Sequence, residues 1–311
     1  MTDPEAFQAG HSSSLPTNAC GAEHQSDDVA LVANNLNAAL HSNTYRLAHE
    51  DQELLNSNDM RGVRMLLEIS KPEMVLEAAQ IHSTILVFGG ACLVEGVAAQ
   101  RQLHIAQREF EQQPDNAALQ RQVKRCKRLV ELSRFYSAAR EFAHLVSCEP
   151  QGENGCSHVI ATGGGPGIME AANRGAFDAG AKSIGFNISL PHEQNPNPFV
   201  TPDLCFRFNY FALRKFHFVM RAAGAVFFPG GFGTLDELFE VLTLRQTGIK
   251  RPIPVVLFGK DYWQEVINFN ALADSGLIAD EHLDLVQFAD TPSEAWELIR
   301  GSARYNECSA R

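Results

Sequence analysis

The sequence predicts an α/β protein with a doubly wound parallel sheet, helices on both of its faces and a helical extension at the N-terminus. Three observations support this fold class. From residue 84 onward, short apolar segments of strand type alternate with longer amphipathic segments of helix type. The strand-type segments are apolar without interruption, as in sheets that are buried on both faces. Two of them run into glycine-rich turns that lead directly into helices, which is typical of the carboxyl ends of parallel strands.

The chain before the sheet divides into two parts. Residues 1–28 are rich in Ser, Asn, Gly and His and show little periodicity, so we expect a disordered tail. Residues 29–80 show helical periodicity in pieces, interrupted at Pro72, and predict a helical extension. Residues 81–311 are then expected to form one domain around the sheet.

Within this domain, strands and helices are expected to alternate. After a first strand at 84–88, a polar segment over about 98–130 predicts one or two charged helices with a break at Pro114. Gly224 is the predicted stop of a helix, and Thr291 is the predicted N-cap of the last one. The later elements are expected as a helix over 133–147, a strand, turn and helix over 157–180, a strand over 182–188, a helix over 209–224, a second strand, turn and helix over 225–248, a strand over 253–259, a helix over 262–276, a strand over 283–289 and a helix over 291–300.

The charge distribution argues against nucleic acid or a membrane as the main partner. The net charge is −11, and most of the excess lies in residues 1–80, which carry 12 acidic and 4 basic side chains. The basic stretch at 121–128 is the exception, and we interpret it as the solvated face of a helix. No apolar run is long enough to span a bilayer, and no signal peptide is recognisable.

The seven cysteines predict neither a disulfide framework nor a metal site. They form no CxxC pair and no Cys/His cluster at metal-ligand spacing. An odd number of cysteines without a secretory signal is typical of reduced thiols, so we expect a cytoplasmic protein.

The first glycine-rich turn, TGGGPGIMEA, suits the binding of a phosphate. Its small residues let the backbone approach a ligand, and the helix that starts beyond it offers unpaired N–H groups and a positive dipole end. The pattern is neither the dinucleotide fingerprint nor a P-loop. A plain tight turn is the alternative interpretation, but a second such turn at the same sheet edge favours a binding site. The candidate binding residues here are Gly164, Gly165, Gly167 and Met169.

The second turn, FFPGGFGTLDE, carries both phosphate-binding candidates and a carboxylate. Its candidate binding residues are Gly230, Gly231, Gly233 and Thr234. Glu237 allows two interpretations. With Thr234 it fits a capping box, in which the carboxylate would reach back to the helix start. Alternatively it acts on a cationic part of a reaction, such as a developing ribosyl oxocarbenium ion, or on a water that attacks it.

A basic pair lies on the helix that precedes the second turn. Arg214 and Lys215 fall near the start of this helix, at the sheet edge where both turns are expected. A surface arginine is one interpretation, but a basic residue beside two candidate phosphate loops is well placed to hold an anion.

Together these residues resemble the LONELY GUY (LOG) family of phosphoribohydrolases, which cleave nucleoside 5′-monophosphates to free base and ribose 5-phosphate. The family signature PGGxGTxxE stands here as PGGFGTLDE at 229–237, with the upstream Arg-Lys pair at 214–215. The family's first turn, GGGxxGxM, stands as GGGPGIM at 163–169, with one residue fewer between the glycines. The longer bacterial branch is the more similar one, and the resemblance covers about 84–300.

The resemblance implies a Rossmann-like nucleotide-binding catalytic domain that forms a homodimer or a larger assembly. Arg214 and Glu237 would be the catalytic residues, the arginine positioning substrate and the glutamate stabilising the ribosyl cation or activating water. The glycine amides, Thr234 and Lys215 would contact the substrate. No metal or other cofactor is implied, and the preferred base is not specified by the motifs.

Other hypotheses stay open beside this one. Relatives of the fold bind nucleotides or molybdenum cofactor without hydrolysis, but those would be expected to lack the Arg/Glu pair. An assembly or signalling protein, working through the 98–130 insertion and the acidic N-terminal extension, is another. The label lysine decarboxylase, often attached to this family, has no support, since neither Lys182 nor Lys215 has recognisable Schiff-base surroundings.

Overall fold

The structure, a computed structural model, describes residues 25–149, 155–190, 195–249 and 253–309. It divides into two compact units, Met1–Val63 and Arg64–Arg311. Most of the predicted N-terminal tail lies outside the described residues. The first unit contains α1 (Gln25–Leu40), the short 3₁₀ helix η1 (Asn43–Tyr45) and α2 (Gln52–Asn56). Asp51 caps α2 by accepting hydrogen bonds from the N–H groups of Glu53 and Leu54, both at 3.0 Å.

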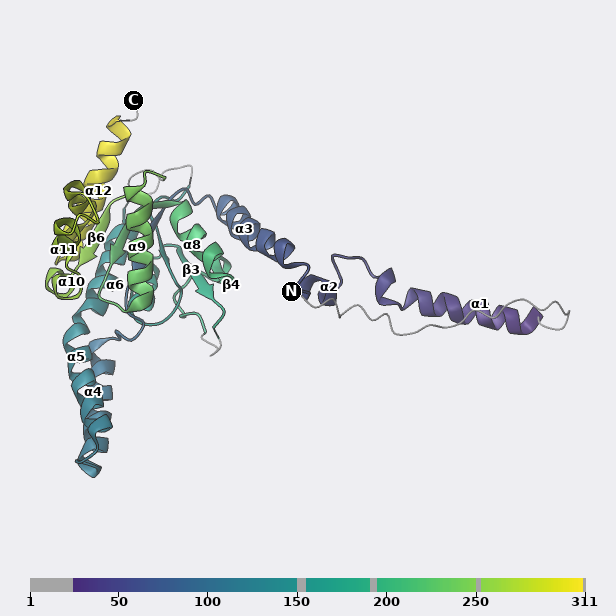
Figure 1. Ribbon diagram of the computed structural model, residues 1–311, viewed down its shortest axis with the longest axis horizontal. Coiled ribbons are helices and arrows are strands. Elements are labelled where there is room, and N and C mark those ends of the chain that lie inside the picture. The colour runs from purple at the N-terminus through teal and green to yellow at the C-terminus, as the bar shows by residue number, and fades with distance from the viewer. Residues whose placement is uncertain (1–24, 150–154, 191–194, 250–252, 310–311) are drawn as a thin grey trace. The chain divides into compact units, whose positions relative to one another are not determined.

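The second unit is built on a seven-stranded sheet in which every pair of neighbours is parallel (Figure 1). The strand order is β4-β3-β2-β1-β5-β6-β7, so the chain winds outward from β1 to one edge and returns to the other side of β1. The predicted α/β fold with a doubly wound parallel sheet is thereby confirmed. The strands are β1 (Thr84–Phe88), β2 (Val159–Thr162), β3 (Ser183–Ile188), β4 (Cys205–Phe208), β5 (Ala222–Phe227), β6 (Val255–Phe258) and β7 (Gln287–Ala289).

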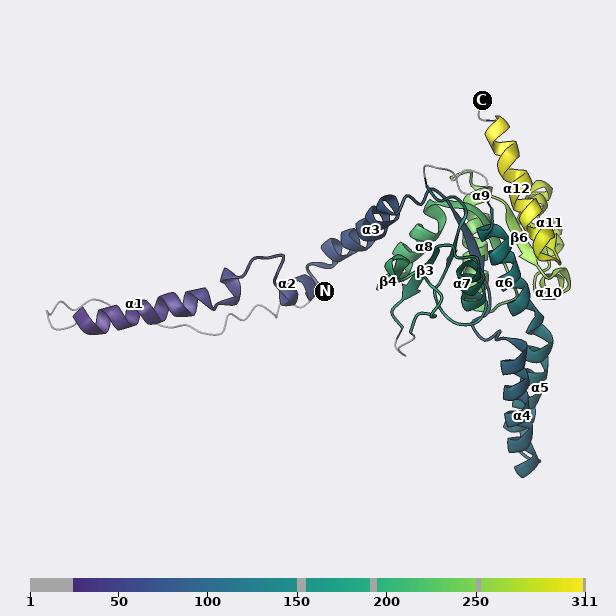
Figure 2. The same cartoon turned by 180° about the vertical axis from the view of Figure 1, so that it is seen from behind.

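Helices cover both faces of the sheet (Figure 2). Alternate residues of β1 enter different cores, Ile85 and Val87 on one face and Leu86 and Phe88 on the other. The first core is closed by α6 (Arg134–Ser147), α7 (Ile168–Asp178) and α12 (Pro292–Ser309). The second is closed by α3 (Arg61–Ala78), α8 (Phe211–Met220), α9 (Phe232–Gln246) and α10 (Lys260–Val266).

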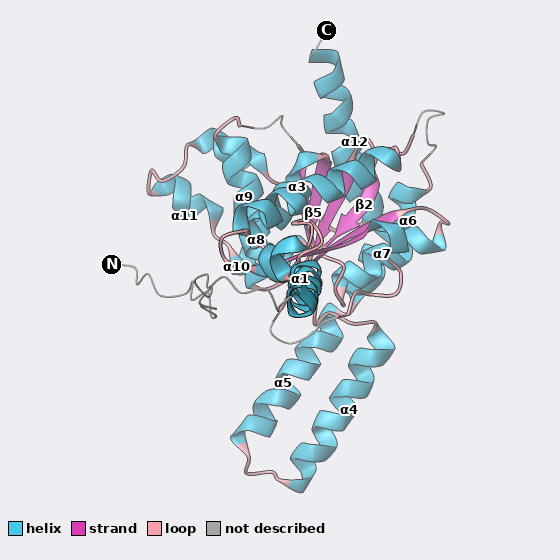
Figure 3. Cartoon of the chain, turned by 90° about the vertical axis from the view of Figure 1, so that its right-hand side faces the viewer, coloured by secondary structure: helices cyan, strands magenta, loops and turns pink. Residues whose placement is uncertain are grey.

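The polar insertion forms two helices that lie side by side and project from the sheet (Figure 3). These are α4 (Gly96–Gln112) and α5 (Ala117–Leu132), separated at Pro114 as predicted. Asn116 caps α5 by accepting hydrogen bonds from the N–H groups of Ala118 and Leu119.

Pro72 does not interrupt α3, contrary to the prediction. A proline inside a helix leaves the carbonyl four residues earlier without its usual donor. Here that carbonyl belongs to Glu68, and it accepts a hydrogen bond from the ring Nε2 of His217 at 3.0 Å. The helix therefore continues because a side chain from α8 replaces the missing N–H.

Three further boundaries differ from the sequence-based expectation. Gly224 is no helix stop: α8 ends at Met220, and Gly224 lies inside β5, where a Cβ would stand 2.7 Å from Cγ2 of Ile299. The predicted helix over 262–276 is two helices, α10 and α11 (Phe269–Asp274), because Asn268 caps a new start. Of the strand predicted over 283–289, only β7 (Gln287–Ala289) is strand, and residues 283–285 belong to the 3₁₀ helix η3 (Asp280–Leu285). Strand β4, which follows the 3₁₀ helix η2 (Pro202–Leu204), was not predicted.

The last helix begins as predicted, and its N-cap is confirmed. Thr291 Oγ1 accepts a hydrogen bond from the N–H of Glu294 at 3.2 Å, and Pro292 occupies the first helical position.

Candidate active site

The turns after β1, β2 and β5 meet at the point where the strand order reverses. This is the edge at which parallel α/β sheets bind ligands. The backbone of Gly90, after β1, joins the other two turns: its N–H donates to the Pro229 carbonyl at 2.9 Å, and its carbonyl accepts from the Ile168 N–H at 3.2 Å. The two glycine-rich turns singled out in the sequence therefore lie on either side of a third.

A cavity of about 400 Å³ opens where these turns meet the start of α8. Six of the eleven candidate residues line it. They are Met169, Arg214, Gly231, Gly233, Thr234 and Glu237, and Gly163 of the first turn lines the cavity beside them.

The candidates that do not line the cavity are Gly164, Gly165, Gly167, Lys215 and Gly230. The structure gives three of the glycines a role within the turns. Gly164 (φ +67°) and Gly167 (φ +71°) have backbone conformations that favour glycine, and a Cβ on Gly167 would overlap the Gly90 carbonyl. A Cβ on Gly230 would overlap the Thr234 hydroxyl and stand 2.9 Å from the Gly90 N atom. These glycines let the three turns pack closely.

Glu237 is not the partner in a capping box. Helix α9 begins at Phe232 with Gly231 as its N-cap, so Thr234 is the third residue of the helix. Its N–H donates to the Gly231 carbonyl at 3.0 Å, and Glu237 points away from the helix start toward α8. The capping interpretation fails because glycine replaces threonine as the cap.

Glu237 faces the basic pair on α8 inside the protein. Its Oε1 lies 3.8 Å from Nη2 of Arg214, and its Oε2 lies 3.4 Å from Nζ of Lys215. The side chains of Arg214 and Glu237 are only 14% and 6% exposed. Burial raises the pKa of Glu237 to about 7, although the two cations act in the opposite direction. The carboxyl group can thus gain or lose a proton near neutral pH.

Arg214 is held by aromatic rings and keeps hydrogen-bonding capacity. Its Cζ lies 5.5 Å from the ring centroid of Phe211 and 5.2 Å from that of Phe218. Burial lowers the pKa of the guanidinium, and the Glu237 carboxylate opposes this shift. The buried Nε atom has no hydrogen-bond partner among the described residues. A cation with spare donors at a cavity wall can bind an anion.

Lys215 is turned toward carboxylates outside the cavity. Its Nζ lies 2.8 Å from Oδ2 of Asp236 and 2.9 Å from Oε2 of Glu240, in addition to its contact with Glu237. Burial lowers the pKa of Lys215, but these acids outweigh that effect and the net shift is upward. Among the described residues that line the cavity, Lys215 contacts Glu237.

The turn after β1 also forms part of the cavity wall, although it was not among the predicted binding residues. Gly89, Gly90, Ala91 and Cys92 all line the cavity, as does Phe88 at the end of the strand. The sequence feature that could have revealed this turn is the glycine pair Gly89-Gly90 directly after an apolar strand, at the same sheet edge as the two longer glycine-rich turns.

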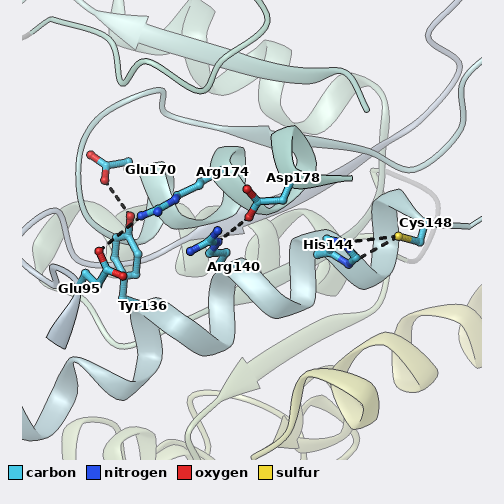
Figure 4. Close-up of polar contacts among 8 residues, drawn as sticks. All are labelled: Glu95, Tyr136, Arg140, His144, Cys148, Glu170, Arg174 and Asp178. Carbon is cyan, nitrogen blue, oxygen red and sulfur yellow. Dashed lines mark hydrogen bonds and ion pairs between the residues drawn. The ribbon is translucent and has the colours of Figure 1, made fainter. Parts of the chain in front are cut away.

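A cluster of polar contacts on the other side of the first turn fastens α7 to its neighbours (Figure 4). The hydroxyl of Tyr136 on α6 donates to Glu170 in the first turn of α7 at 2.8 Å, and Arg174 lies 3.5 Å from Glu95, which directly precedes α4. Burial raises the pKa of Tyr136 to about 12, so the hydroxyl keeps its proton. These contacts hold the helix start that follows the first glycine-rich turn.

Two kinds of feature are absent from the described part of the chain. Residues 25–149, 155–190, 195–249 and 253–309 contain no group of three His, Cys, Asp or Glu side chains arranged to hold a metal ion. Within the same ranges, every helix is too short or too polar to cross a bilayer.

Known proteins resemble part of this chain. A family model described as "Possible lysine decarboxylase" matches residues 169–299. Cytokinin riboside 5′-monophosphate phosphoribohydrolase LOG3 of Arabidopsis thaliana is 29% identical over 158 residues, which is 49% of this chain and 70% of the relative. The probable cytokinin riboside 5′-monophosphate phosphoribohydrolase LOGL3 of Oryza sativa subsp. japonica is 25% identical over 158 residues, or 48% of this chain and 71% of the relative.

A solved X-ray structure, that of TM1055, covers 70% of this chain and 99% of its own, at 17% sequence identity and a TM-score of 0.42. The signature at 229–237, its upstream Arg-Lys pair and the curated relatives agree with one another. These similarities support the resemblance of this chain to the LONELY GUY (LOG) family.

Proposed function

We propose that the protein hydrolyses the N-glycosidic bond of nucleoside 5′-monophosphates, among them AMP and cytokinin riboside monophosphates, and releases the free base and ribose 5-phosphate. One observation carries the proposal: Arg214 and Glu237, buried and 3.8 Å apart, stand at one cavity with two glycine-rich helix starts. The phosphoribohydrolase names of the relatives support the reaction class.

The 5′-phosphate is proposed to bind at the start of α9. Gly231, Gly233 and Thr234 line the cavity there, and the first turn of a helix presents N–H groups without intrahelical partners. The positive end of the helix dipole favours a dianion at this position. The Thr234 hydroxyl can donate to a phosphate oxygen, and Arg214 can neutralise part of the charge.

Glu237 is proposed to act on the sugar. As the bond between C1′ and the base nitrogen breaks, its electron pair leaves with the base and positive charge develops on the ribose. An ionised Glu237 stabilises that charge and accepts a proton from the water whose oxygen attacks C1′. The departing nitrogen takes up a proton from solvent. No metal or organic cofactor takes part in this scheme.

Lysine decarboxylation is a poor match for these residues. A lysine that forms a Schiff base must lose its proton, and enzymes achieve this by lowering its pKa. The three acids around Lys215 raise its pKa instead. Lys182 donates to the Ala79 carbonyl at 3.4 Å, away from the cavity.

The proposal is tested by incubating the purified protein with AMP, GMP, CMP and isopentenyladenine riboside monophosphate while free base is followed by chromatography. We expect release from at least one purine nucleotide, and the product pattern assigns the preferred base. Absence of release from all four, with tight binding of an intact nucleotide or of a pterin, would instead support a carrier without catalytic activity.

We also propose that the protein works as a homodimer or a larger homo-oligomer. Exposed apolar side chains lie on α8 and α9, with Phe232 92% exposed and Phe211, Phe216, Met220 and Phe239 also open to solvent. A patch of this kind is typical of a protein interface. Sedimentation equilibrium is the test, and a Phe232→Ser variant is expected to shift the mass toward the monomer.

A further inference from the structure

Helix α8, which carries Arg214, is fastened along its length to α3. Helix α3 packs with α8 in the second core, and polar contacts join the two helices at three points. They occur before the first turn of α8, in its middle and at its end. None of the α3 residues involved lines the cavity of the proposed active site.

The first contact fixes the start of α8. The carboxylate of Glu68 accepts hydrogen bonds from the N–H groups of Asn209 and Tyr210, at 3.0 and 3.2 Å. Tyr210 is the N-cap of α8, and its own side chain makes no capping hydrogen bond. Glu68 therefore supplies from another helix the acceptors and the negative charge that a helix start requires.

The other two contacts continue along the helix. The Glu68 carbonyl, freed by Pro72, accepts from Nε2 of His217, a residue whose side chain is fully buried. Glu73 lies 2.9 Å from Nη2 of Arg221, which follows the last residue of α8. Glu68 thus holds α8 through its side chain at one point and through its backbone at another.

Arg214 lies between these points of attachment. Its N–H donates to the Tyr210 carbonyl at 3.2 Å, so Arg214 belongs to the turn whose start Glu68 fixes. It is also one turn before His217. If the start of α8 frays, the guanidinium moves relative to Glu237, from which it is now separated by 3.8 Å.

We propose that Glu68 is a positioning residue for Arg214, acting through the first turn of α8 from outside the cavity. This inference rests on the proposed function for its effect on catalysis, but its structural content can be tested without turnover. A displacement of about 1 Å at a catalytic group can lower the rate by about 100-fold.

The test compares Glu68→Ala with Glu77→Ala, an exposed glutamate on the same helix, and with Glu68→Gln, which retains one acceptor oxygen. We expect Glu68→Ala to lower kcat/KM by about 10- to 100-fold, Glu68→Gln to lie between it and wild type, and Glu77→Ala to match wild type. In an Arg214→Ala background, Glu68→Ala should have little further effect, because the two residues act as one unit. A general loss of folding would instead persist in that background.

A crystal structure of Glu68→Ala, or of Glu68→Gln if the alanine variant does not fold, separates this inference from the proposed function. We expect Arg214 to be displaced from Glu237. An unmoved Arg214, or an undiminished effect of Glu68→Ala in the Arg214→Ala background, overturns the positioning role. A wild-type protein that releases no base overturns the proposed function alone, because the position of Arg214 is still read from the crystal structures.

Discussion

Arg214 and Glu237 stand 3.8 Å apart on two different helices, and both side chains are largely withdrawn from solvent. A buried carboxylate is costly unless a cation compensates it. Here Arg214 and Lys215 provide that compensation only in part, since burial still raises the pKa of Glu237 to about 7. At neutral pH the Glu237 carboxyl group is therefore populated in both its protonated and its ionised form.

Glu237→Gln should abolish most of the activity while leaving the fold intact. The amide has the same shape but can neither stabilise a ribosyl cation by charge nor accept a proton. We expect kcat to fall by about 100- to 10,000-fold, the range that general acid–base groups contribute. The measurement is the initial rate of base release from the best substrate.

Asp236→Asn is the matched control for this variant. Asp236 is the neighbouring residue on α9, also contacts Lys215, and does not line the cavity. Its activity should remain within a few-fold of wild type. Equal losses in both variants would show that the charge near Lys215, and not the Glu237 carboxylate at the cavity, controls the reaction.

The pH dependence of kcat/KM should show an acidic limb near pH 7. The proposed role needs the ionised carboxylate, and the raised pKa of Glu237 places its ionisation there. Activity is then expected to rise with pH through about 6 to 8 and to level off above that range. The residual activity of Glu237→Gln should lack this limb, and a limb near pH 4.5 in the wild type would contradict the assignment.

The same raised pKa should appear in the stability of the protein. A carboxyl group with a higher pKa in the folded than in the unfolded state stabilises the fold fully below its unfolded pKa, and this contribution is lost as the pH rises through the folded value. Between about pH 4.5 and 7 the wild type should therefore lose about 1–3 kcal/mol relative to Glu237→Gln. Urea unfolding of both proteins at pH 5 and pH 8 measures the difference, and parallel pH profiles would contradict it.

Much of the fold could be predicted because strand segments and helix segments differ in hydrophobic period. Strand β4 escaped prediction because its four residues, Cys205–Phe208, include a charged arginine and form one edge of the sheet. The continuation of α3 through Pro72 depends on a hydrogen bond from His217, which is distant in sequence. Tertiary contacts of this kind override the local signals that end a helix.

The catalytic side chains of the candidate site could be predicted from a sequence motif. The role of each glycine could not, because it depends on how the backbone turns pack on one another. Arg214 and Glu237 follow from residue type and position, and the structure brings them together at one cavity. The glycines of a turn look alike in sequence, yet some face the cavity and others face a neighbouring turn. Only the packing of the three turns on one another distinguishes them.

Two glycines of the second turn should differ in how well they tolerate substitution by alanine. A methyl group on Gly230 would overlap the buried Thr234 hydroxyl and crowd the Gly90 backbone, whereas one on Gly233 meets no atom within 4 Å. We expect Gly230→Ala to lower the free energy of unfolding by about 1–3 kcal/mol, as overpacking does. Gly233→Ala, in the first turn of α9, should be neutral or slightly stabilising because alanine favours the helix. Urea denaturation of both variants beside the wild type is the measurement. Equal stabilities would show that the second turn can shift away from Gly90, and that the close packing of the three turns is not required for folding.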